Sequence, residues 1–291
     1  MIVVTGATGK LGSHVVQGLL KVVPPSTLRA AVRNPDKAAA FAAAGITVRR
    51  ADYDDPPSLE AALEGAEKLL LISANEVGRR LPQHLAVIEA AKKAGVGQIV
   101  YTSLLRADSS PLALAGEHRA TEDAIRASGL PFVILRNGWY IENHTGQMPV
   151  ILQHGAIVGA AGNGRFASAT RADYAAAAVA VLTTDGHVGR TYELAGDHPF
   201  TLTELAEEIS RQAGRTIVYT NLEPDAYLEL LVNAGVPKPF AEILVDSDVH
   251  AANGALDDST GDLRRLIGRP TTTLATAVAD ALKQTVPGKD G

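Results

Sequence analysis

Three glycines near the start of the chain have the spacing of a phosphate-binding turn. Gly6, Gly9 and Gly12 follow the apolar run Ile2–Thr5 and precede an amphipathic stretch. In a strand–turn–helix unit, the first glycine permits a tight turn, the second lets the backbone approach a pyrophosphate, and the third allows close packing. Free N–H groups at the helix start attract phosphates, so this context favours a dinucleotide site over a plain tight turn. The expected cofactor contacts in this turn are Gly6, Thr8, Gly9, Lys10, Leu11 and Gly12.

The residue at the end of the second predicted strand indicates which nicotinamide cofactor binds. NAD sites usually carry an acidic residue there, whereas this chain has Arg33. A guanidinium binds a 2′-phosphate through paired, charge-assisted hydrogen bonds that contribute roughly 1.5–3 kcal/mol, a preference of about tenfold or more. Lys10 is placed to assist. The alternative is a solvated surface arginine, but we expect the cofactor to be NADPH.

Polar and small residues stand at the ends of three further predicted strands. Ligands of open α/β sheets bind at the carboxyl ends of the strands, so these residues are candidates to line the cofactor channel. Asp52 and Tyr53 are placed to bracket the adenine, or else they form an ordinary loop start with a packing tyrosine. The other expected channel residues are Ser73, Ala74, Thr102 and Ser103.

The helix expected after the fifth strand lacks the usual acid–base pair of a carbonyl reductase. Short-chain dehydrogenases usually hold a tyrosine and a lysine four positions apart there, and the lysine lowers the tyrosine pKa. Here Leu114 stands where the tyrosine would be, and His118 stands near the lysine position. An acceptor that takes hydride readily needs only proximity and orientation, which favours quinones and cationic conjugated dyes. His118 is a candidate to bind nicotinamide or donate a proton, with a structural histidine as the alternative.

The segment after the sixth predicted strand supplies the candidate substrate residues. Trp139, the only tryptophan, and Tyr140 offer flat rings on which a quinone can stack, although both are also suited to packing a domain junction. Asn143 and His144 are polar candidates at the same mouth, and Asn137 is a candidate cofactor contact. Together with His118, Tyr140 is our candidate catalytic residue.

These residues require a set of elements that the first half of the chain provides. Apolar, β-branched runs alternate with Ala- and Leu-rich helical stretches, which predicts βαβ units and a Rossmann-like, doubly wound parallel sheet. We expect an NADP(H)-binding domain at residues 1–140, with 165–185 packing on it, and a smaller, mostly helical substrate region at 141–291. The expected strands are Ile2–Thr5, Leu28–Arg33, Thr47–Arg50, Lys68–Ile72, Gln98–Thr102 and Phe132–Arg136, and the expected helices are Leu11–Lys21, Asp36–Ala44, Ser58–Glu64, Pro82–Ala94 and Leu112–Ser128.

The composition of the chain argues against several classes of function, among them nucleic-acid binding, thiolate catalysis and metal binding. Hydrophobic residues make up 46% of the 291 residues, ample for a buried core, and the net charge of −5 disfavours a nucleic-acid partner. The chain has no cysteine, which excludes thiolate catalysis and disulfides, and its eight histidines have no metal-ligand spacing. It shows no leader sequence and no apolar run long enough for a bilayer, so we expect a cytoplasmic protein without metal or membrane partner.

Several motifs resemble the NmrA-like atypical short-chain dehydrogenases, and among them most closely the NADPH-dependent quinone reductases of type 2. The resemblance covers nearly the whole chain and includes the glycine turn, Ala31–Pro35, Lys68–Ser73 and Tyr101–Leu105. It implies NADPH in an interdomain cleft and direct hydride transfer to a quinone without flavin, in a monomer or weak homodimer. The triphenylmethane-dye reductases have the same frame, and the loop Ser103–Asp108 is closer to that of the quinone reductases. Further motifs that carry the resemblance are Leu135–Asn143, Ala167–Ala175 and Leu266–Thr273.

Three functions are therefore open on the sequence. The first is an NADPH:quinone oxidoreductase, and the second is a reductase of triphenylmethane dyes or other conjugated acceptors. The third belongs to another class: a non-catalytic NADP(H) sensor that regulates a partner. The missing tyrosine–lysine pair is compatible with this third function, while the acidic charge balance and the lack of a partner motif are against it.

Overall fold

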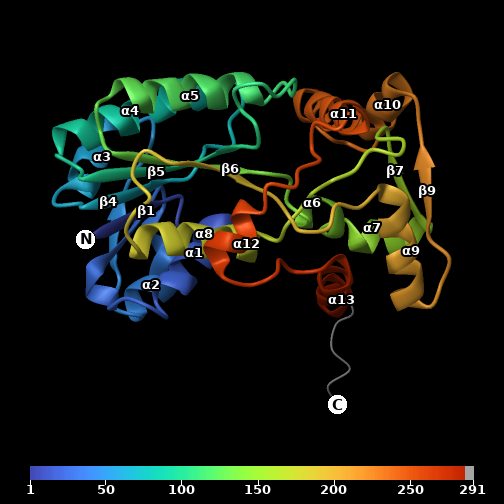
Figure 1. The fold of residues 1–291 in the computed structure, drawn as a ribbon, viewed down its shortest axis with the longest axis horizontal. Coiled ribbons are helices and arrows are strands. Elements are labelled where there is room, and N and C mark those ends of the chain that lie inside the picture. The colour runs from blue at the N-terminus through green and yellow to red at the C-terminus, as the bar shows by residue number, and fades with distance from the viewer. Residues whose placement is uncertain (286–291) are drawn as a thin grey trace, which may run out of the picture.

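The computed structural model describes residues 1–285 and contains a parallel, seven-stranded sheet. Its strand order is β3–β2–β1–β4–β5–β6–β8, so the order reverses between β1 and β4, as in doubly wound folds (Figure 1). This confirms the predicted fold class. The strands are β1 (Ile2–Thr5), β2 (Leu28–Val32), β3 (Thr47–Arg50), β4 (Lys68–Leu71), β5 (Gln98–Leu104), β6 (Phe132–Asn137) and β8 (Thr191–Leu194).

All six predicted strands are present, and their boundaries differ from the prediction by at most two residues. Strands β2 and β4 end one residue earlier than expected, whereas β6 ends one residue later and β5 two residues later. Every residue of β5 is buried, which explains why its apolar and small polar residues continue the strand past Thr102. The seventh strand, β8, was not predicted.

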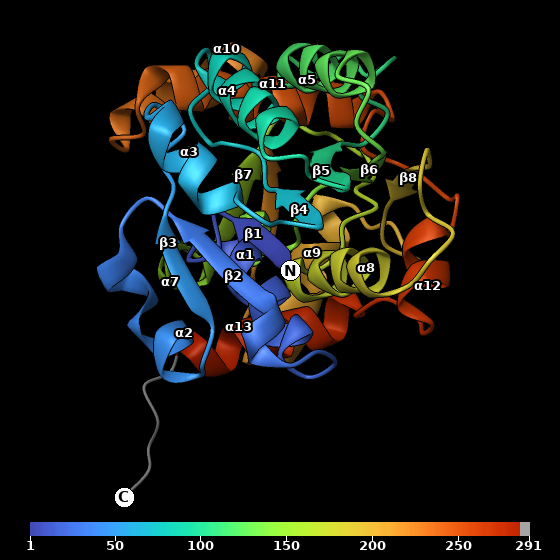
Figure 2. The same ribbon diagram turned by 90° about the vertical axis from the view of Figure 1, so that its left-hand side faces the viewer.

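Helices cover both faces of the sheet (Figure 2). On one face, α1 packs closely against α8, and both contribute to a core that includes Val15 and Val181. On the other face, α3, α4 and α5 cover a second core that includes Leu69 and Ile99. The predicted helix Asp36–Ala44 is divided between a 3₁₀ turn, η2 (Pro35–Ala38), and a short α2. The helices of the two faces are α1 (Lys10–Leu19), α2 (Ala39–Ala43), α3 (Pro56–Leu63), α4 (Arg80–Lys93), α5 (Ala115–Ala127) and α8 (Arg171–Thr183); a further 3₁₀ turn is η1 (Pro25–Thr27).

The second half of the chain contains more strand than predicted. A separate parallel pair, β7 (Ala156–Gly159) with β9 (Val218–Asn221), lies beside α9, α10 and α11 in Figure 1. The expectation of a mostly helical region is otherwise met. Its helices are α6 (Glu142–Thr145), α7 (Met148–His154), α9 (Leu202–Ala213), α10 (Pro224–Asn233), α11 (Lys238–Ala252), α12 (Asp262–Ile267) and α13 (Leu274–Thr285).

Several elements beyond residue 140 return to the large sheet. The predicted helix within 165–185 is α8, which packs on α1, while β8 extends the sheet and α12 packs against both α8 and β8. Residue 140 is therefore not a break in the fold. The division into a cofactor domain and a substrate region at this residue stays a prediction. Within residues 1–285, no helix combines the length and apolar character needed to cross a membrane.

Candidate functional site

The glycine turn has the geometry that a dinucleotide cradle requires. Gly6 adopts a φ of +59°, in the left-handed region, and its carbonyl oxygen accepts from the N–H of Gly9 at 2.8 Å. A Cβ on Gly12 would lie 2.2 Å from the Gly6 oxygen, so only glycine lets α1 approach the turn this closely. Thr8 and Lys10 are exposed, whereas the Leu11 side chain is buried in the core, which leaves its backbone as its means of contact with a ligand.

Arg33 directly follows β2 and is open to solvent. Its side chain is 75% exposed, and its only ion-pair partner within residues 1–285 is Glu76, at 3.5 Å. The next residue, Asn34, accepts a hydrogen bond from the Asp36 N–H and so caps the η2 turn. The guanidinium is therefore not held by a tight bidentate carboxylate, and it can turn toward a phosphate group.

Tyr53 is held inside the fold by its hydroxyl group. This hydroxyl lies 2.7 Å from Thr5 Oγ1 and 3.0 Å from the carbonyl oxygen of Ile72, and burial raises the Tyr53 pKa. The adjacent Asp52 side chain accepts from the Asp54 N–H and lies 3.5 Å from Arg50. The structure thus gives both residues a local role, and a contact with adenine stays a prediction.

The predicted channel residues at the ends of β4 and β5 differ in where their hydroxyl groups point. Thr102 Oγ1 accepts from the Ser73 N–H at 2.9 Å, so these two neighbours are joined at the carboxyl edge of the sheet. Ser103 instead donates to a carboxylate oxygen of Glu122 at 2.5 Å and is nearly fully buried. Its hydroxyl group is therefore turned toward α5.

Asn137, at the end of β6, carries a buried polar atom that lacks a partner. The side chain is 4% exposed; its amide nitrogen donates to the Tyr140 hydroxyl at 3.4 Å, but its amide oxygen has no partner among residues 1–285. Buried polar atoms are nearly always paired, so this oxygen, at the ligand-binding edge of the sheet, is available to accept a hydrogen bond from a bound group. This atom, the Gly12 close approach and Arg33 together fit NADPH.

Of the two candidate catalytic residues, His118 is buried and Tyr140 is partly buried. His118 is 6% exposed, its Nδ1 lies 2.7 Å from the Tyr101 hydroxyl, and burial lowers its pKa well below the usual value. Burial likewise raises the pKa of Tyr140, whose ring lies under the Arg171 guanidinium at 4.8 Å and edge-on to Tyr174. At neutral pH both side chains are therefore uncharged.

The structure separates the four predicted substrate residues into two groups. Tyr140 and Asn143 meet at Arg171, which donates to Asn143 Oδ1 at 3.0 Å. Trp139 packs against the apolar core of the second half of the chain, and the His144 ring lies edge-on to Phe166 at 4.9 Å. Burial lowers the pKa of His144 to about 4. The sequence predicted that all four residues line one substrate site, whereas in the fold only Tyr140 and Asn143 contact Arg171.

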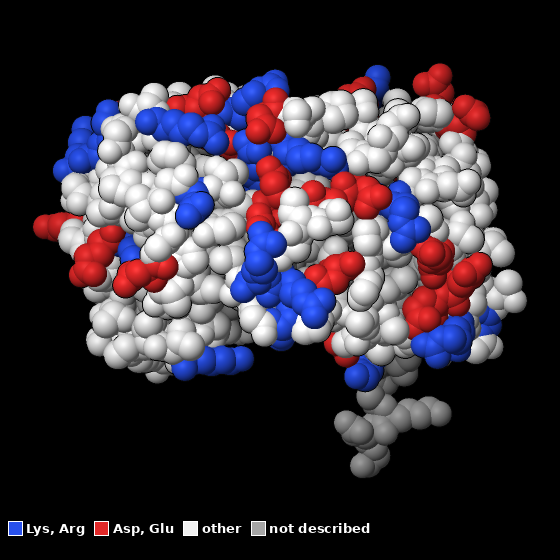
Figure 3. All heavy atoms as spheres, in the orientation of Figure 1, with Lys and Arg blue, Asp and Glu red and all other residues white. Residues whose placement is uncertain are grey.

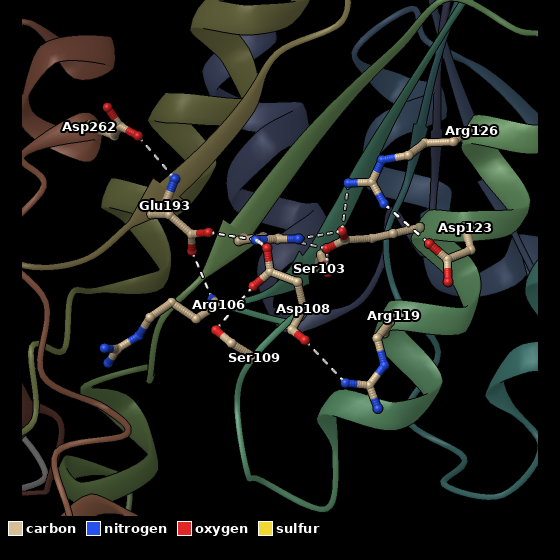
Figure 4. A network of polar contacts seen from close by, with 11 residues as sticks. Ser103, Arg106, Asp108, Ser109, Arg119, Asp123, Arg126, Glu193 and Asp262 are labelled. Carbon is tan, nitrogen blue, oxygen red and sulfur yellow. Dashed lines mark hydrogen bonds and ion pairs between the residues drawn. The ribbon is translucent and has the colours of Figure 1, made fainter.

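A buried ionic network that the sequence reasoning missed lies behind the end of β6 (Figure 4). Arg136 makes a bidentate pair with Glu122, at 2.9 and 2.7 Å, and also contacts Glu193 and Asp108. Burial opposes its charge, but the hydrogen bonds that Arg136 donates to these carboxylates outweigh that effect and raise the Arg136 pKa. The network joins β6, α5 and β8. Its sequence signal was a charged residue at the end of an otherwise apolar predicted strand.

Arg106 extends this network to the second half of the chain. Its backbone N–H donates to Glu193 at 2.8 Å, and it has a φ of +51°, an uncommon value for a residue other than glycine. Its guanidinium donates to carbonyl oxygens just beyond the end of α11. These acceptors belong to Gly254, Ala255 and Asp257, at 3.0, 2.9 and 2.6 Å. Arg106 therefore ties α11 to the loop that follows β5.

Comparisons with known proteins agree with the fold and with a nicotinamide cofactor. Residues 6–185 match the NAD(P)H-binding family. The chain is 55% identical to quinone oxidoreductase 2 of Escherichia coli over 96% of its length and 98% of that protein. A crystal structure of the NADPH-dependent E. coli quinone oxidoreductase with NADPH has a TM-score of 0.95 at 54% identity, covering 97% of this chain and all of that one. A Citrobacter triphenylmethane reductase structure with NADP(H) has a TM-score of 0.93 at 41% identity, with coverage of 97% and 100%.

Proposed function

The chain belongs to the NAD(P)H-binding family, and we propose that it is an NADPH-dependent quinone reductase. The observation that carries the proposal is its 55% identity, along nearly the whole of both chains, to a protein named quinone oxidoreductase 2. The glycine turn and Arg33 support the same conclusion, because they suit a pyrophosphate and a 2′-phosphate. We infer an enzyme of the cytoplasm that acts as a monomer or weak homodimer.

We assign the cofactor to the carboxyl edge of the sheet. N–H groups at the start of α1 would hold the pyrophosphate, Arg33 the 2′-phosphate, and the unpaired amide oxygen of Asn137 would accept from the nicotinamide end. Ser73, Ala74 and Thr102 would line the channel between them. When bound, NADPH supplies a hydride directly to the quinone, without flavin or metal.

The chain itself need only orient the acceptor and hold a proton. Tyr140 holds its proton at neutral pH, as a phenol ordinarily does, and burial raises its pKa further, so it is suited to donate a hydrogen bond to a quinone oxygen. His118 is buried and neutral, which makes it a better hydrogen-bond partner than a source of positive charge. A quinone anion is delocalised and easily protonated, so orientation carries most of the catalysis.

We further infer that a small conjugated molecule, rather than a nucleic acid or a membrane, is the partner. Lysine, arginine and acidic side chains are interleaved along the middle of the face drawn in Figure 3, rather than sorted into one basic stripe. The net charge of −5 has the same implication. A dye reductase is the second candidate, because the Citrobacter triphenylmethane reductase shares 41% identity.

The test is NADPH oxidation measured with a panel of quinones and one triphenylmethane dye. We expect quinones to accelerate oxidation, with kcat/KM for the best quinone exceeding that for the dye. A higher kcat/KM for the dye would favour the second candidate. Tight NADPH binding with no acceptor-dependent oxidation would contradict the enzyme and favour a non-catalytic NADP(H) sensor.

A further inference from the structure

The chain beyond β4 is held by side chains at the predicted cofactor edge. After β4 ends at Leu71, the consecutive N–H groups of Ile72, Ser73 and Ala74 donate to Thr5 Oγ1, Thr102 Oγ1 and His84 Nε2. The distances are 3.1, 2.9 and 2.9 Å. The two threonines lie on strands that flank β4, whereas His84 lies on α4. Three separate elements therefore fix the path of this segment.

The hydrogen bonds around His84 determine its tautomer. Thr121 donates its hydroxyl proton to the Glu117 carbonyl oxygen at 2.8 Å, so Thr121 Oγ1 acts as acceptor toward His84 Nδ1, at 3.0 Å. His84 Nδ1 must then carry the proton, and Nε2 is left as the acceptor that the Ala74 N–H needs. His84 is 0% exposed, and burial lowers its pKa to about 3, so it stays neutral.

A second residue of α4 holds the other backbone group of Ala74. Arg80 donates from Nε to the Ala74 carbonyl oxygen at 2.8 Å and is itself 6% exposed. Its guanidinium lies 3.4 Å from Glu117 on α5, and the same carboxylate accepts from the Gly78 N–H. Both backbone polar groups of Ala74 are thus held by buried side chains, the N–H by His84 and the carbonyl oxygen by Arg80.

We propose that His84 is a positioning residue of the cofactor site, an inference that rests on the proposed function. It does not touch cofactor or quinone in this scheme. It acts through the Ala74 N–H, keeping Ser73 and Ala74 in the path along which the cofactor lies. Binding geometry must be held to within a fraction of an ångström by such supporting residues. Arg80 supports the same position by holding the Ala74 carbonyl oxygen.

The experiment measures the NADPH dissociation constant of purified His84→Leu, His84→Gln and Val87→Ala proteins by fluorescence titration. His84→Leu leaves the Ala74 N–H unpaired and should raise the dissociation constant about tenfold. His84→Gln supplies an amide oxygen as acceptor and should restore most of the affinity. Val87 lies one turn after His84 on α4 and is also fully buried, but it makes no contact with Ala74 through a polar group. Val87→Ala should therefore lower the unfolding temperature without weakening NADPH binding.

The kinetic readout separates positioning from simple destabilisation. The KM for NADPH should rise in His84→Leu, while the KM for quinone at saturating NADPH should change by less than roughly twofold. Should His84→Leu fail to fold, Thr121→Val takes its place. Valine cannot accept from His84 Nδ1, so nothing then keeps the proton on Nδ1 and the lone pair on Nε2. This variant should also raise the NADPH dissociation constant.

Distinct outcomes bear on the inference and on the proposed function. A folded His84→Leu protein, or failing that Thr121→Val, that binds NADPH as tightly as wild type overturns the inference. An equal loss of affinity in Val87→Ala also overturns it. Wild-type protein that binds NADPH but reduces no acceptor removes only the proposed function, since the binding comparison still holds.

Discussion

At the scale of single residues, exposure separates two arginines that each lie at a strand end. Arg136 is 5% exposed, and its guanidinium is already shared among Glu122, Glu193 and Asp108. Arg33 is 75% exposed and has one ion-pair contact, at 3.5 Å, within residues 1–285. A guanidinium already shared among three carboxylates is not available to a phosphate, so Arg33 is the one of the two that suits NADPH.

Arg33→Asp should reverse the cofactor preference. A carboxylate repels a 2′-phosphate, so we expect the NADPH dissociation constant to rise at least about tenfold, with little change for NADH. Lys21→Asp is the matched control, because it makes the same charge change beyond the far end of α1 at another exposed position. Titrations of all three proteins with both cofactors provide the measurement. Equal losses for NADPH and NADH would show that Arg33 does not read the phosphate.

At the scale of elements, the strands that could be predicted from the sequence are mostly those with a continuous apolar run. Strands β1, β2, β4, β5 and β6 are mostly apolar and almost fully buried, and glycines mark several strand ends, so the positions of these strands could be predicted directly. In β7, β8 and β9, at least half of the residues are half-buried or exposed, so these strands lack the continuous buried run that marks most of the predicted strands. β7 also pairs with β9 across some sixty residues, and β9 is largely exposed.

The same distinction applies to the candidate site. The glycine turn and Arg33 were predictable because their chemistry is contained in adjacent residues. The hydrogen bonds that hold Ile72, Ser73 and Ala74 were missed, because their acceptors come from β1, β5 and α4. One signal was present: Arg80, Gln83 and His84 occupy the stripe that Val87 and Ala91 continue, so polar residues stand on the buried face of α4.

Gly12→Ala should disrupt the junction between α1 and the turn. The added Cβ would meet the Gly6 carbonyl oxygen at 2.2 Å and the Ala7 Cα at 2.8 Å, and neither backbone atom can yield cheaply. We expect a loss of about 1–3 kcal/mol in the free energy of unfolding, together with weakened NADPH binding. Urea unfolding and cofactor titration measure the two effects.

Gly116→Ala is the control for this substitution. Gly116 lies within α5, and nothing stands within 4 Å of its added Cβ. Alanine should therefore stabilise the helix by about 0.5–1 kcal/mol and leave NADPH binding unchanged. If Gly12→Ala bound NADPH with wild-type affinity, the close approach would have no part in the cofactor site.

At the scale of the whole molecule, buried histidines contribute to the response to acid. Burial lowers the pKa of His84 to about 3, of His118 well below its usual value and of His144 to about 4. In the unfolded chain each would titrate near 6.5. The unfolded state therefore binds more protons as the pH falls below 6.5, and folding loses stability there. Glu122 and Asp108 have lowered pKa values, so their contribution is lost only below about pH 4.5.

This linkage predicts a stability loss between pH 7.5 and 5.0 that depends on named histidines. Each fully buried, neutral histidine should lower the free energy of unfolding by about 2 kcal/mol at pH 5.0, a large part of the usual 5–15 kcal/mol. His84→Gln removes one titrating group, so its stability should fall by about 2 kcal/mol less over this range. His14→Gln, at an exposed position on α1, should follow the wild-type pH dependence. Urea unfolding at both pH values tests this, and a wild-type slope in His84→Gln would mean that His84 is protonated in the folded protein at pH 5.0.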